Sequence, residues 1–324
     1  MIFEQLIRDV NTALASQHYP TQPEGLYEPI AYVLSLGGKR IRPVFLLLAY
    51  QMMSGRTDLV PMPAALGLET YHNYTLLHDD LMDRALVRRG QPTVHRKWND
   101  NTAILSGDSM LVLAYQHLLA CPNITPAALE CFTRTALEIG EGQQMDMNFE
   151  LRTDVSEAEY LEMIRLKTSV LVACAMQLGG MLAGATPEAA QLLYRFGEEI
   201  GIAFQLQDDY LDCFGTAESF GKRIGGDILC NKKTYLAINA WQCATPQQRV
   251  QLEHWWATND SAQADAKIAA VLALYRHVGV DTLCQTAINA YYTKAKAYLD
   301  AIDVPTERKQ AIWDFANSLL GREV

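Results

Sequence analysis

Apolar residues recur at helical spacing over much of the chain. Leu192, Phe196, Ile200 and Phe204 follow one another by one turn each, so they form an apolar stripe on a helix. Alternating patterns typical of strands are hard to find, whereas spacings of three and four residues are common. The pattern therefore predicts an all-α protein.

The prolines indicate where long helices can run. Most of them lie before residue 127, whereas 127–186 and 188–245 contain none. Proline-free stretches of this length permit long helices. Because repeats, low-complexity tracts and a clear linker are also missing from the sequence, we predict one domain over 1–324.

One uncharged stretch, 168–187, is about as long as a bilayer requires. It contains Thr168, Ser169, Gln177 and three glycines, which favours a core helix over a membrane span. The first residues include Glu4 and Arg8 inside an apolar pattern, which is unlike a signal peptide. The sequence therefore predicts a cytoplasmic protein without a transmembrane segment.

Charge and cysteine content narrow the function. The chain has 27 Lys and Arg against 37 Asp and Glu, a net charge of −10. This disfavours nucleic-acid binding, which depends on a basic face, but is compatible with a small basic pocket. The seven cysteines are scattered and form no C-x-x-C pair, so neither a disulfide framework nor a zinc site is expected.

The pattern D-D-x-x-D occurs twice. The first copy holds Asp79, Asp80 and Asp83, and the second holds Asp208, Asp209 and Asp212. A single copy would be interpreted as a solvated acidic turn, but both copies lie among aliphatic and aromatic residues typical of a core. Two carboxylate clusters on different helices would make an oxygen-rich site for hard divalent cations, and Mg²⁺ is the natural candidate.

Basic residues and glycines flank both clusters. Arg88 and Arg89 follow the first cluster, and arginine suits bidentate recognition of phosphate. Further candidates come from three other places: Lys39, Arg40 and Arg42 in LGGKRIRP, Lys167, and Lys222, Arg223, Lys232 and Lys233 in GKRIGGDILCNKKT. Each could be a surface charge, but their position beside the aspartates favours a diphosphate-binding site.

The five segments LGGKRIRP, LLHDDLMDRALVRRGQPTVH, LKTS, FQLQDDYLD and GKRIGGDILCNKKT resemble the trans-isoprenyl diphosphate synthases, the polyprenyl synthetases that include farnesyl and geranylgeranyl diphosphate synthases. The resemblance spans 37–234 in the family's order. It implies a bundle of long helices around a deep central cavity, acting as a homodimer. It also implies three Mg²⁺ per active site, with Mn²⁺ able to substitute, and small isoprenoid diphosphates as substrates.

The resemblance also assigns residue roles. Metal ions on the allylic diphosphate would be bound by Asp79, Asp83 and Asp208, with Asp80, Asp209 and Asp212 supporting them. The same diphosphate would be contacted by Arg88, Lys167 and Lys222, and isopentenyl diphosphate by Lys39, Arg42, His72 and Arg89. Thr168 and Gln205 would lie beside the developing carbocation and complete, with Lys167 and Lys222, the catalytic set. The family's basic C-terminal tail is reduced to Arg322 here.

Product length is expected to depend on residues one to two turns before Asp79. Tyr71 and Tyr74 share a helix face and could close the cavity, with Thr75 beside them; both tyrosines could instead be ordinary core residues. In the resembling family, one aromatic residue at the position of Tyr74 and an uninserted first cluster go more often with twenty carbons. The expected product is therefore geranylgeranyl diphosphate, with farnesyl diphosphate as the alternative.

Three other protein classes were weighed. A class I terpene cyclase would share the cation chemistry but leave Lys39, Arg42 and Arg89 unexplained. A di-iron bundle needs two Glu-x-x-His pairs, and the sequence has one, Glu69 with His72. A non-catalytic binding subunit is disfavoured by the two intact clusters.

Two histidines are interpreted as structural. His78 precedes the first cluster and His95 lies in QPTVH. Both are expected to be hydrogen-bonded core residues, because an imidazole would be an unusual ligand in an oxygen site for a hard cation.

Overall fold

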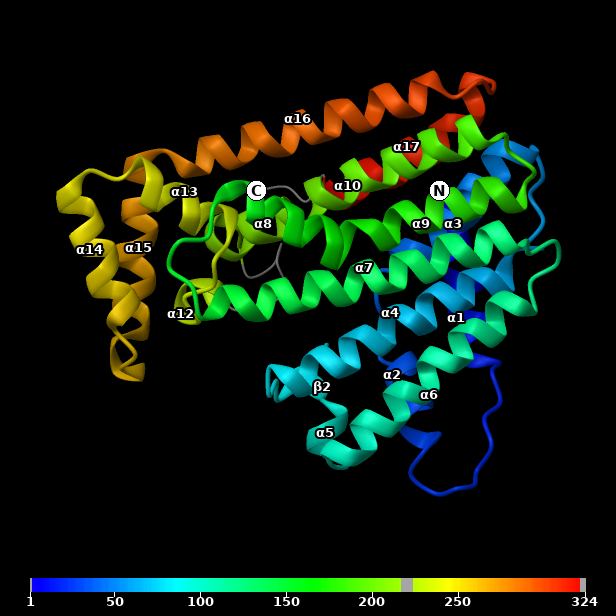
Figure 1. The fold of residues 1–324 in the computed structure, drawn as a ribbon, viewed down its shortest axis with the longest axis horizontal. Helices are drawn as coiled ribbons and strands as arrows, with labels where there is room; N and C mark the ends of the chain where they lie inside the picture. The colour runs from blue at the N-terminus through cyan, green and yellow to red at the C-terminus, as the bar shows by residue number, and fades with distance from the viewer. Residues whose placement is uncertain (1, 217–223, 321–324) are drawn as a thin grey trace. The chain divides into compact units, whose positions relative to one another are not determined.

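The computed structural model describes residues 2–216 and 224–320. Helices account for nearly all the regular structure, so the all-α prediction is confirmed. The elements up to residue 150 are α1 (Ile2–Ala15), α2 (Glu28–Ser35), α3 (Ile41–Ser54), α4 (Met62–Met82), strands β1 (Val87–Arg88) and β2 (Gln91–Pro92), α5 (Val94–Lys97), α6 (Asp100–Leu119) and α7 (Pro126–Glu150) (Figure 1).

The second half of the chain continues in the same way. Its elements are α8 (Glu157–Ile164), the π-helix η1 (Arg165–Ser169), α9 (Val170–Leu182), α10 (Pro187–Phe214), α12 (Gly226–Leu229), α13 (Tyr235–Cys243), α14 (Pro246–Ala257), the short 3-10 helix η2 (Ser261–Gln263), α15 (Ala264–Val278), α16 (Val280–Ala301) and α17 (Thr306–Leu320).

The helices form two compact units. The first unit comprises Met1–Thr133, Cys174–Tyr194 and Asp303–Ile312; the second comprises Arg134–Ala173, Arg195–Ile302 and Trp313–Val324. The single domain expected over 1–324 stays a prediction.

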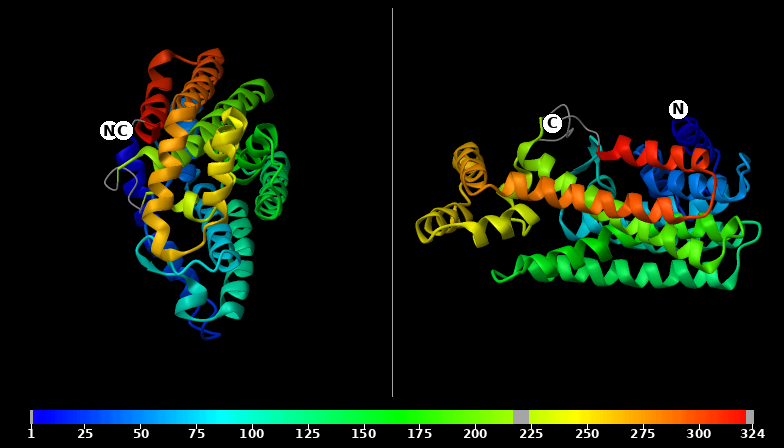
Figure 2. Two further views of the ribbon diagram at one scale, coloured as in Figure 1. Left: turned by 90° about the vertical axis from the view of Figure 1, so that its left-hand side faces the viewer. Right: turned by 90° about the horizontal axis from the view of Figure 1, so that it is seen from above.

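In the first unit, α4 and α6 pack along their length (Figures 1 and 2). Glycines allow this close approach: a Cβ on Gly67 would lie 3.0 Å from the Ala114 carbonyl, and one on Gly107 would overlap the His78 ring. α3 is buried almost throughout, including Phe45 and Leu46. The carboxyl end of α4, which carries the first aspartate cluster, is therefore fixed by its neighbours.

In the second unit, α8, α10, α13, α15 and α16 enclose a common core. Tyr160, Leu206, Leu236, Val271 and Val280 are among its fully buried members. α14 and α15 lie side by side (Figure 1, yellow). This core surrounds the part of α10 that carries the second aspartate cluster.

A π-helical turn separates α8 from α9. Its defining bond runs from the Val170 amide to the Arg165 carbonyl, five residues back. Two glycines make room for this wider turn. A Cβ on Gly142 would lie 2.3 Å from the backbone nitrogen of Lys167, and one on Gly201 would lie 2.6 Å from Ser169 Cα. No side chain fits at either contact.

All of α9 lies within the uncharged stretch, and Val170, Cys174 and Leu178 on it are fully buried. None of the helices within 2–216 and 224–320 is long and apolar enough to cross a membrane. The interpretation of this stretch as a core helix is confirmed.

We expect Gly179→Ala to destabilise the protein by about 1–3 kcal/mol, the usual cost of overpacking. A Cβ there would lie 2.3 Å from the Leu46 carbonyl oxygen and 2.8 Å from Ala49 Cβ. Urea denaturation of the purified variant measures the change. Gly140→Ala on α7 is the matched control, because a Cβ there meets nothing within 4 Å; it should be neutral or stabilise by up to about 1 kcal/mol. Equal stability of both variants would contradict this packing.

Candidate active site

The first aspartate cluster lies at the carboxyl end of α4. Asp79 is half-buried, Asp83 is exposed, and Asp80 is buried. Arg88 Nε donates to Asp80 Oδ2 at 2.7 Å, and Arg88 Nη2 lies 3.7 Å from Asp79 Oδ2. The three carboxylates therefore differ: Asp80 is held within the protein, whereas Asp79 and Asp83 are accessible.

The electrostatics of Asp80 follow from its burial. Burial raises its pKa, and the hydrogen bond and charge of Arg88 act against that rise. A buried carboxylate without such a partner would be costly. Arg88, on the short β1 strand, is thus tied to the cluster that it follows in sequence.

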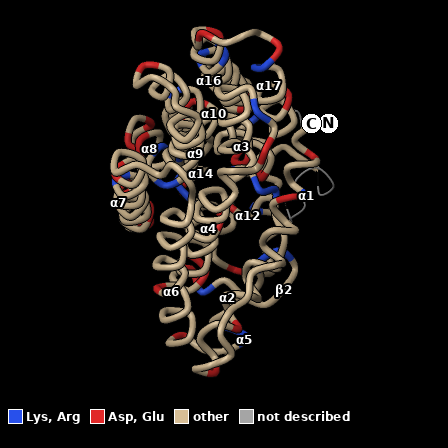
Figure 3. The backbone as a smooth tube through the Cα atoms, turned by 90° about the vertical axis from the view of Figure 1, so that its right-hand side faces the viewer, with Lys and Arg blue, Asp and Glu red and all other residues tan. Residues whose placement is uncertain are grey.

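Arg89 points to a different part of the first unit. Its guanidinium donates to the Gly37 carbonyl, and a Cβ on Gly38 would lie 2.9 Å from Arg89 Nη2. The loop between α2 and α3 therefore closes on Arg89, and Gly38 is required there. Figure 3 shows Lys and Arg positions near β2 in blue.

Arg42 and His72 lie in the same arginine-rich region. Arg42 has a buried Nε for which no described atom accepts a hydrogen bond. Burial lowers the pKa of Arg42 to about 10, with Glu69 acting in the opposite direction. Burial also lowers the pKa of His72, and the charges of Arg42, Arg89 and two further arginines add to the effect. A buried guanidinium with an unused donor is suited to an anion.

Arg40 was a phosphate candidate in the sequence, but its side chain is occupied elsewhere. Arg40 Nη1 donates to Glu69 Oε1 at 2.6 Å, with both side chains 2% exposed. Nε donates to Asn11, and Nη2 to the Leu34 carbonyl. Arg40 therefore fastens α1, α2 and α4 together. Lys39 beside it is exposed.

The second aspartate cluster lies on α10 and shows the same division. Asp208 is half-buried, whereas Asp209 and Asp212 are buried. Asp212 Oδ2 accepts from the Asp227 amide at 3.0 Å, which fastens the start of α12 to α10. Asp209 accepts from the Tyr160 hydroxyl and, at 3.1 Å, from Gln205 Nε2.

Burial and the charge of Asp227 raise the pKa of Asp209 to about 7. The hydrogen bonds from Tyr160 and Gln205 and the charge of Lys232 lower it. Four different groups therefore act on this one buried carboxyl.

Lys167 and Thr168 are carried by the π-helical turn. Lys167 Nζ lies 2.6 Å from Asp146 Oδ2, which comes from α7. Thr168 Oγ1 donates to Gln205 Oε1 at 3.3 Å. The structure thus brings Lys167, Thr168, Gln205 and the second cluster into the same unit.

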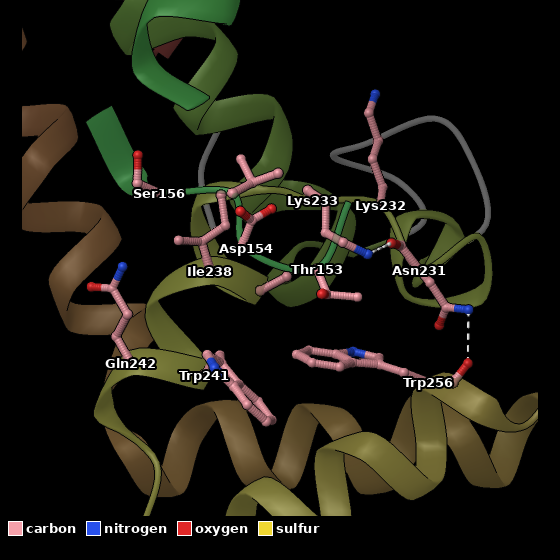
Figure 4. Close-up of a pocket in the computed structure, with 12 residues that line it drawn as sticks. Thr153, Asp154, Ser156, Asn231, Lys232, Lys233, Ile238, Trp241, Gln242 and Trp256 are labelled. Carbon is pink, nitrogen blue, oxygen red and sulfur yellow. Dashed lines mark hydrogen bonds between the residues drawn. The ribbon is translucent and has the colours of Figure 1, made fainter. Parts of the chain in front are cut away.

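Lys232 and Lys233 lie within the described residues, whereas Lys222, Arg223 and Arg322 lie outside them. Lys233 Nζ donates to the Asn231 carbonyl at 3.2 Å in a pocket of about 280 Å³, whose walls include Trp241 and Trp256 (Figure 4). Burial lowers the pKa of Lys233. Both lysines therefore line this aromatic pocket, and the charge of Lys232 also acts on Asp209.

The three predicted floor residues lie on α4. Tyr71 is buried and packs edge-on against Phe132, with ring centroids 5.2 Å apart. Tyr74 and Thr75 are half-buried, and the Tyr74 ring lies 5.4 Å from that of Tyr71. Tyr71 thus has the surroundings of a core residue, and a role for the three in chain length stays a prediction.

The two histidines have the expected hydrogen-bonded surroundings. His78 Nε2 lies 3.3 Å from the Ile104 carbonyl, and its ring packs on Tyr74. His95 is buried, and its Nδ1 lies 3.2 Å from Thr93 Oγ1.

Within the part of the chain that the structure describes, no group of three or more His, Cys, Asp or Glu could hold a metal ion by itself. Oxygen donors such as Asp79, Asp83 and Asp208 nevertheless fit Mg²⁺, which usually keeps waters and shares its coordination with substrate phosphates. A metal site here would need the substrate as a further ligand.

Three residues that contact predicted site residues were missed by sequence reasoning: Tyr160, Asp146 and Asp227. Each stabilises a predicted site residue through one hydrogen bond or ion pair. Only Asp227 had a usable signal, because it lies within the basic motif GKRIGGDILCNKKT.

A model of the polyprenyl synthetase family matches residues 23–274, and the chain belongs to this family. It is therefore an enzyme, a prenyltransferase, and the family works with divalent metal ions.

Two relatives match over nearly the whole length. The chain is 39% identical to geranylgeranyl diphosphate synthase of Methanosarcina mazei, covering 94% of this chain and 91% of the relative. It is 35% identical to geranylfarnesyl diphosphate synthase of Natronomonas pharaonis, covering 97% and 94%.

Solved structures agree with the fold. A crystal structure of a geranylgeranyl pyrophosphate synthase is 43% identical, covers 99% of both chains and has a TM-score of 0.94. The enzyme of that name from Corynebacterium glutamicum, crystallised with isoprenyl diphosphate and magnesium, is 26% identical, covers 99% of both chains and has a TM-score of 0.84.

Proposed function

We propose that this prenyltransferase condenses isopentenyl diphosphate with an allylic diphosphate: dimethylallyl, geranyl or farnesyl diphosphate. The product is a short all-trans polyprenyl diphosphate, and geranylgeranyl diphosphate is favoured by the names of the relatives. Farnesyl diphosphate is the alternative. The observation that supports this function best is that each aspartate cluster has at least one accessible carboxylate beside at least one that is buried and hydrogen-bonded.

The accessible carboxylates are proposed to bind the metal ions, and the buried ones to hold them in place. Asp79, Asp83 and Asp208 would share three Mg²⁺ with the allylic diphosphate, and Mn²⁺ would substitute. Bound metal supplies Lewis acidity that neutralises the departing diphosphate. Family membership, rather than a distance between the two clusters, is the support for their acting on one substrate.

The chain's basic residues would divide between two diphosphates. Arg88, Lys167 and Lys222 are proposed for the allylic diphosphate, and Lys39, Arg42, His72 and Arg89 for isopentenyl diphosphate. The buried, unused Nε of Arg42 supports the second set. Arg88 and Lys167 would exchange their present carboxylate partners, Asp80 and Asp146, for phosphate oxygens.

These residues would carry out three steps. The allylic carbon–oxygen bond breaks, and the electron pair leaves with the diphosphate, whose charge Arg88 and Lys167 help to neutralise. The alkene of isopentenyl diphosphate then attacks the allylic carbon, with Thr168 and Gln205 as nearby dipoles. A proton is lost to the departing diphosphate. Holding both substrates together removes much of the entropic barrier.

We also propose a homodimer. Leu105, Val112 and Leu119 on α6 are 58%, 58% and 60% exposed and are spaced seven residues apart, so they form one apolar stripe. A stripe of this kind is suited to a second helix with the same pattern, and a second copy of the chain provides one.

A cytoplasmic location is proposed as well. The sulfurs of Cys131 and Cys174 are 3.9 Å apart in the core without forming a disulfide, which suits a reducing compartment.

We expect Asp79→Ala and Asp208→Ala each to lower turnover about 10²–10³-fold, because each removes a negative charge that positions metal at the developing diphosphate. Chelation should abolish the activity of the wild-type protein. Chromatography of products from radiolabelled isopentenyl diphosphate measures both effects. Asp100→Ala, which removes an exposed carboxylate paired with Arg84, is the control and should be neutral. Less than tenfold loss in both cluster variants would contradict the proposed metal ligands.

Arg89→Ala should mainly raise the KM for isopentenyl diphosphate, whereas Arg88→Ala should mainly raise that for the allylic substrate. The two side chains have different partners, the Gly37 carbonyl and Asp80 respectively. Initial rates with one substrate varied at a time test the division. Identical KM profiles for the two variants would refute it.

Tyr74→Ala should lengthen the main product by one isoprene unit or more, and Thr75→Phe should shorten it. Both residues are half-buried one turn or more before Asp79, so a change in volume there would move the floor of the cavity. Reversed-phase chromatography of the dephosphorylated products gives the lengths. Unchanged products in both variants would mean that the floor lies elsewhere.

Val112→Glu should shift the protein from dimer to monomer, because it puts a charge into the proposed apolar interface. Sedimentation velocity at several protein concentrations measures the oligomeric state. Thr12→Glu adds the same charge at an exposed position of α1 and should leave the dimer intact. A dimer in both variants, or a monomeric wild type, would exclude this interface.

A further inference from the structure

A line of four hydrogen-bonded side chains crosses the second unit. The Tyr160 hydroxyl donates to Asp209 Oδ2, Gln205 Nε2 donates to Asp209 Oδ1, and Thr168 Oγ1 donates to Gln205 Oε1. The line begins on α8, crosses α10 and ends on the π-helical turn. It joins a residue with no assigned role, Tyr160, to three residues of the predicted site.

Tyr160 is placed to hold Asp209 rather than to meet a substrate. Its residue is 1% exposed and belongs to the core around Leu206 and Leu236. Asp209 is 3% exposed, and each of its two oxygens accepts one of these hydrogen bonds. A carboxylate held on both oxygens has one orientation, so the Gln205 amide that donates to it is oriented too.

The far end of the line is equally confined. Gly142 and Gly201 press on the backbone of the π-helical turn from α7 and α10, at Lys167 and Ser169. Thr168 therefore has little freedom to follow Gln205 if that amide rotates. Loss of the Tyr160 hydroxyl would therefore disturb the alignment of Gln205 on α10 with Thr168 on the turn. Tyr160 itself forms no bond of this line with Thr168 or Lys167.

We propose that Tyr160 is a positioning residue, which holds Asp209 and, through it, Gln205 and Thr168, in the orientation needed to bind the magnesium complex of diphosphate. The inference rests on the proposed function only for the identity of the ligand. In this proposal Asp209 is the central hydrogen-bond acceptor of the line. The neighbouring Asp208 is the metal ligand.

The test is a double-mutant cycle read by binding rather than by turnover. Isothermal titration calorimetry of inorganic diphosphate in excess Mg²⁺ is carried out on the wild type, Tyr160→Phe, Asp209→Asn and the double variant. Each single variant should weaken binding about tenfold, because a buried acceptor or its donor is left unpaired. The double variant should be no weaker than Asp209→Asn, because Tyr160 acts through Asp209.

Tyr235→Phe is the matched control. Tyr235 is a buried tyrosine of the same core. Burial has the largest effect in raising its pKa, and the next largest comes from the charge of Glu157 rather than from an aspartate of either cluster. The control should bind within twofold of the wild type. Binding by Tyr160→Phe within twofold of the wild type, or effects that multiply in the double variant, would overturn the proposal.

If Tyr160→Phe does not fold, Gln205→Met takes its place in the cycle, since it cuts the other bond to Asp209 from a half-buried position. Non-additivity with Asp209→Asn again supports the line, and additivity overturns it. The outcome is independent of catalysis: a wild type that binds the magnesium complex but forms no prenyl product would overturn the proposed function alone.

Discussion

The cost of burying a carboxylate organises each of the two aspartate clusters. A buried carboxylate needs hydrogen-bond donors or a counter-charge. Asp80 has Arg88, Asp209 has Tyr160 and Gln205, and Asp212 has the Asp227 amide. Once these members are fixed, their neighbours on the same helical turn are fixed as well, and Asp79 and Asp208 remain accessible. Each D-D-x-x-D thus combines a buried, hydrogen-bonded carboxylate with an accessible one.

Glycines are the second constraint on the structure, because the elements that carry the candidate site residues approach these positions too closely for a Cβ to fit. Gly38 faces the Arg89 guanidinium, Gly142 and Gly201 face the π-helical turn, and Gly107 faces His78. A side chain at Gly38 would displace the Arg89 guanidinium, and one at Gly142 or Gly201 would displace the backbone of the π-helical turn. The positions of Lys167, Thr168 and Arg89 therefore depend on residues that carry no chemistry themselves.

The sequence was sufficient for the helical class and for the site's acidic and basic motifs, because both are written in local spacing. It could not predict Tyr160, whose position among Met163, Ile164 and other apolar residues is that of any core tyrosine. Arg40 and Lys233 looked like further phosphate ligands, but their partners, Glu69 and the Asn231 carbonyl, come from the folded chain. The π-helical turn needed tertiary contacts to be recognised, since its sequence RLKTS is also compatible with an ordinary helix.

The central claim is that the accessible aspartates bind metal and the buried ones support them. Its most direct measurement is a crystal structure with Mn²⁺ and a non-hydrolysable thio analogue of an allylic diphosphate, with anomalous scattering used to locate the metal. We predict anomalous peaks within coordination distance of Asp79, Asp83 and Asp208, with Asp209 and Asp212 keeping their present hydrogen bonds. Manganese directly bound to Asp209 or Asp212, or a bound analogue without metal at Asp79 and Asp208, would contradict the account.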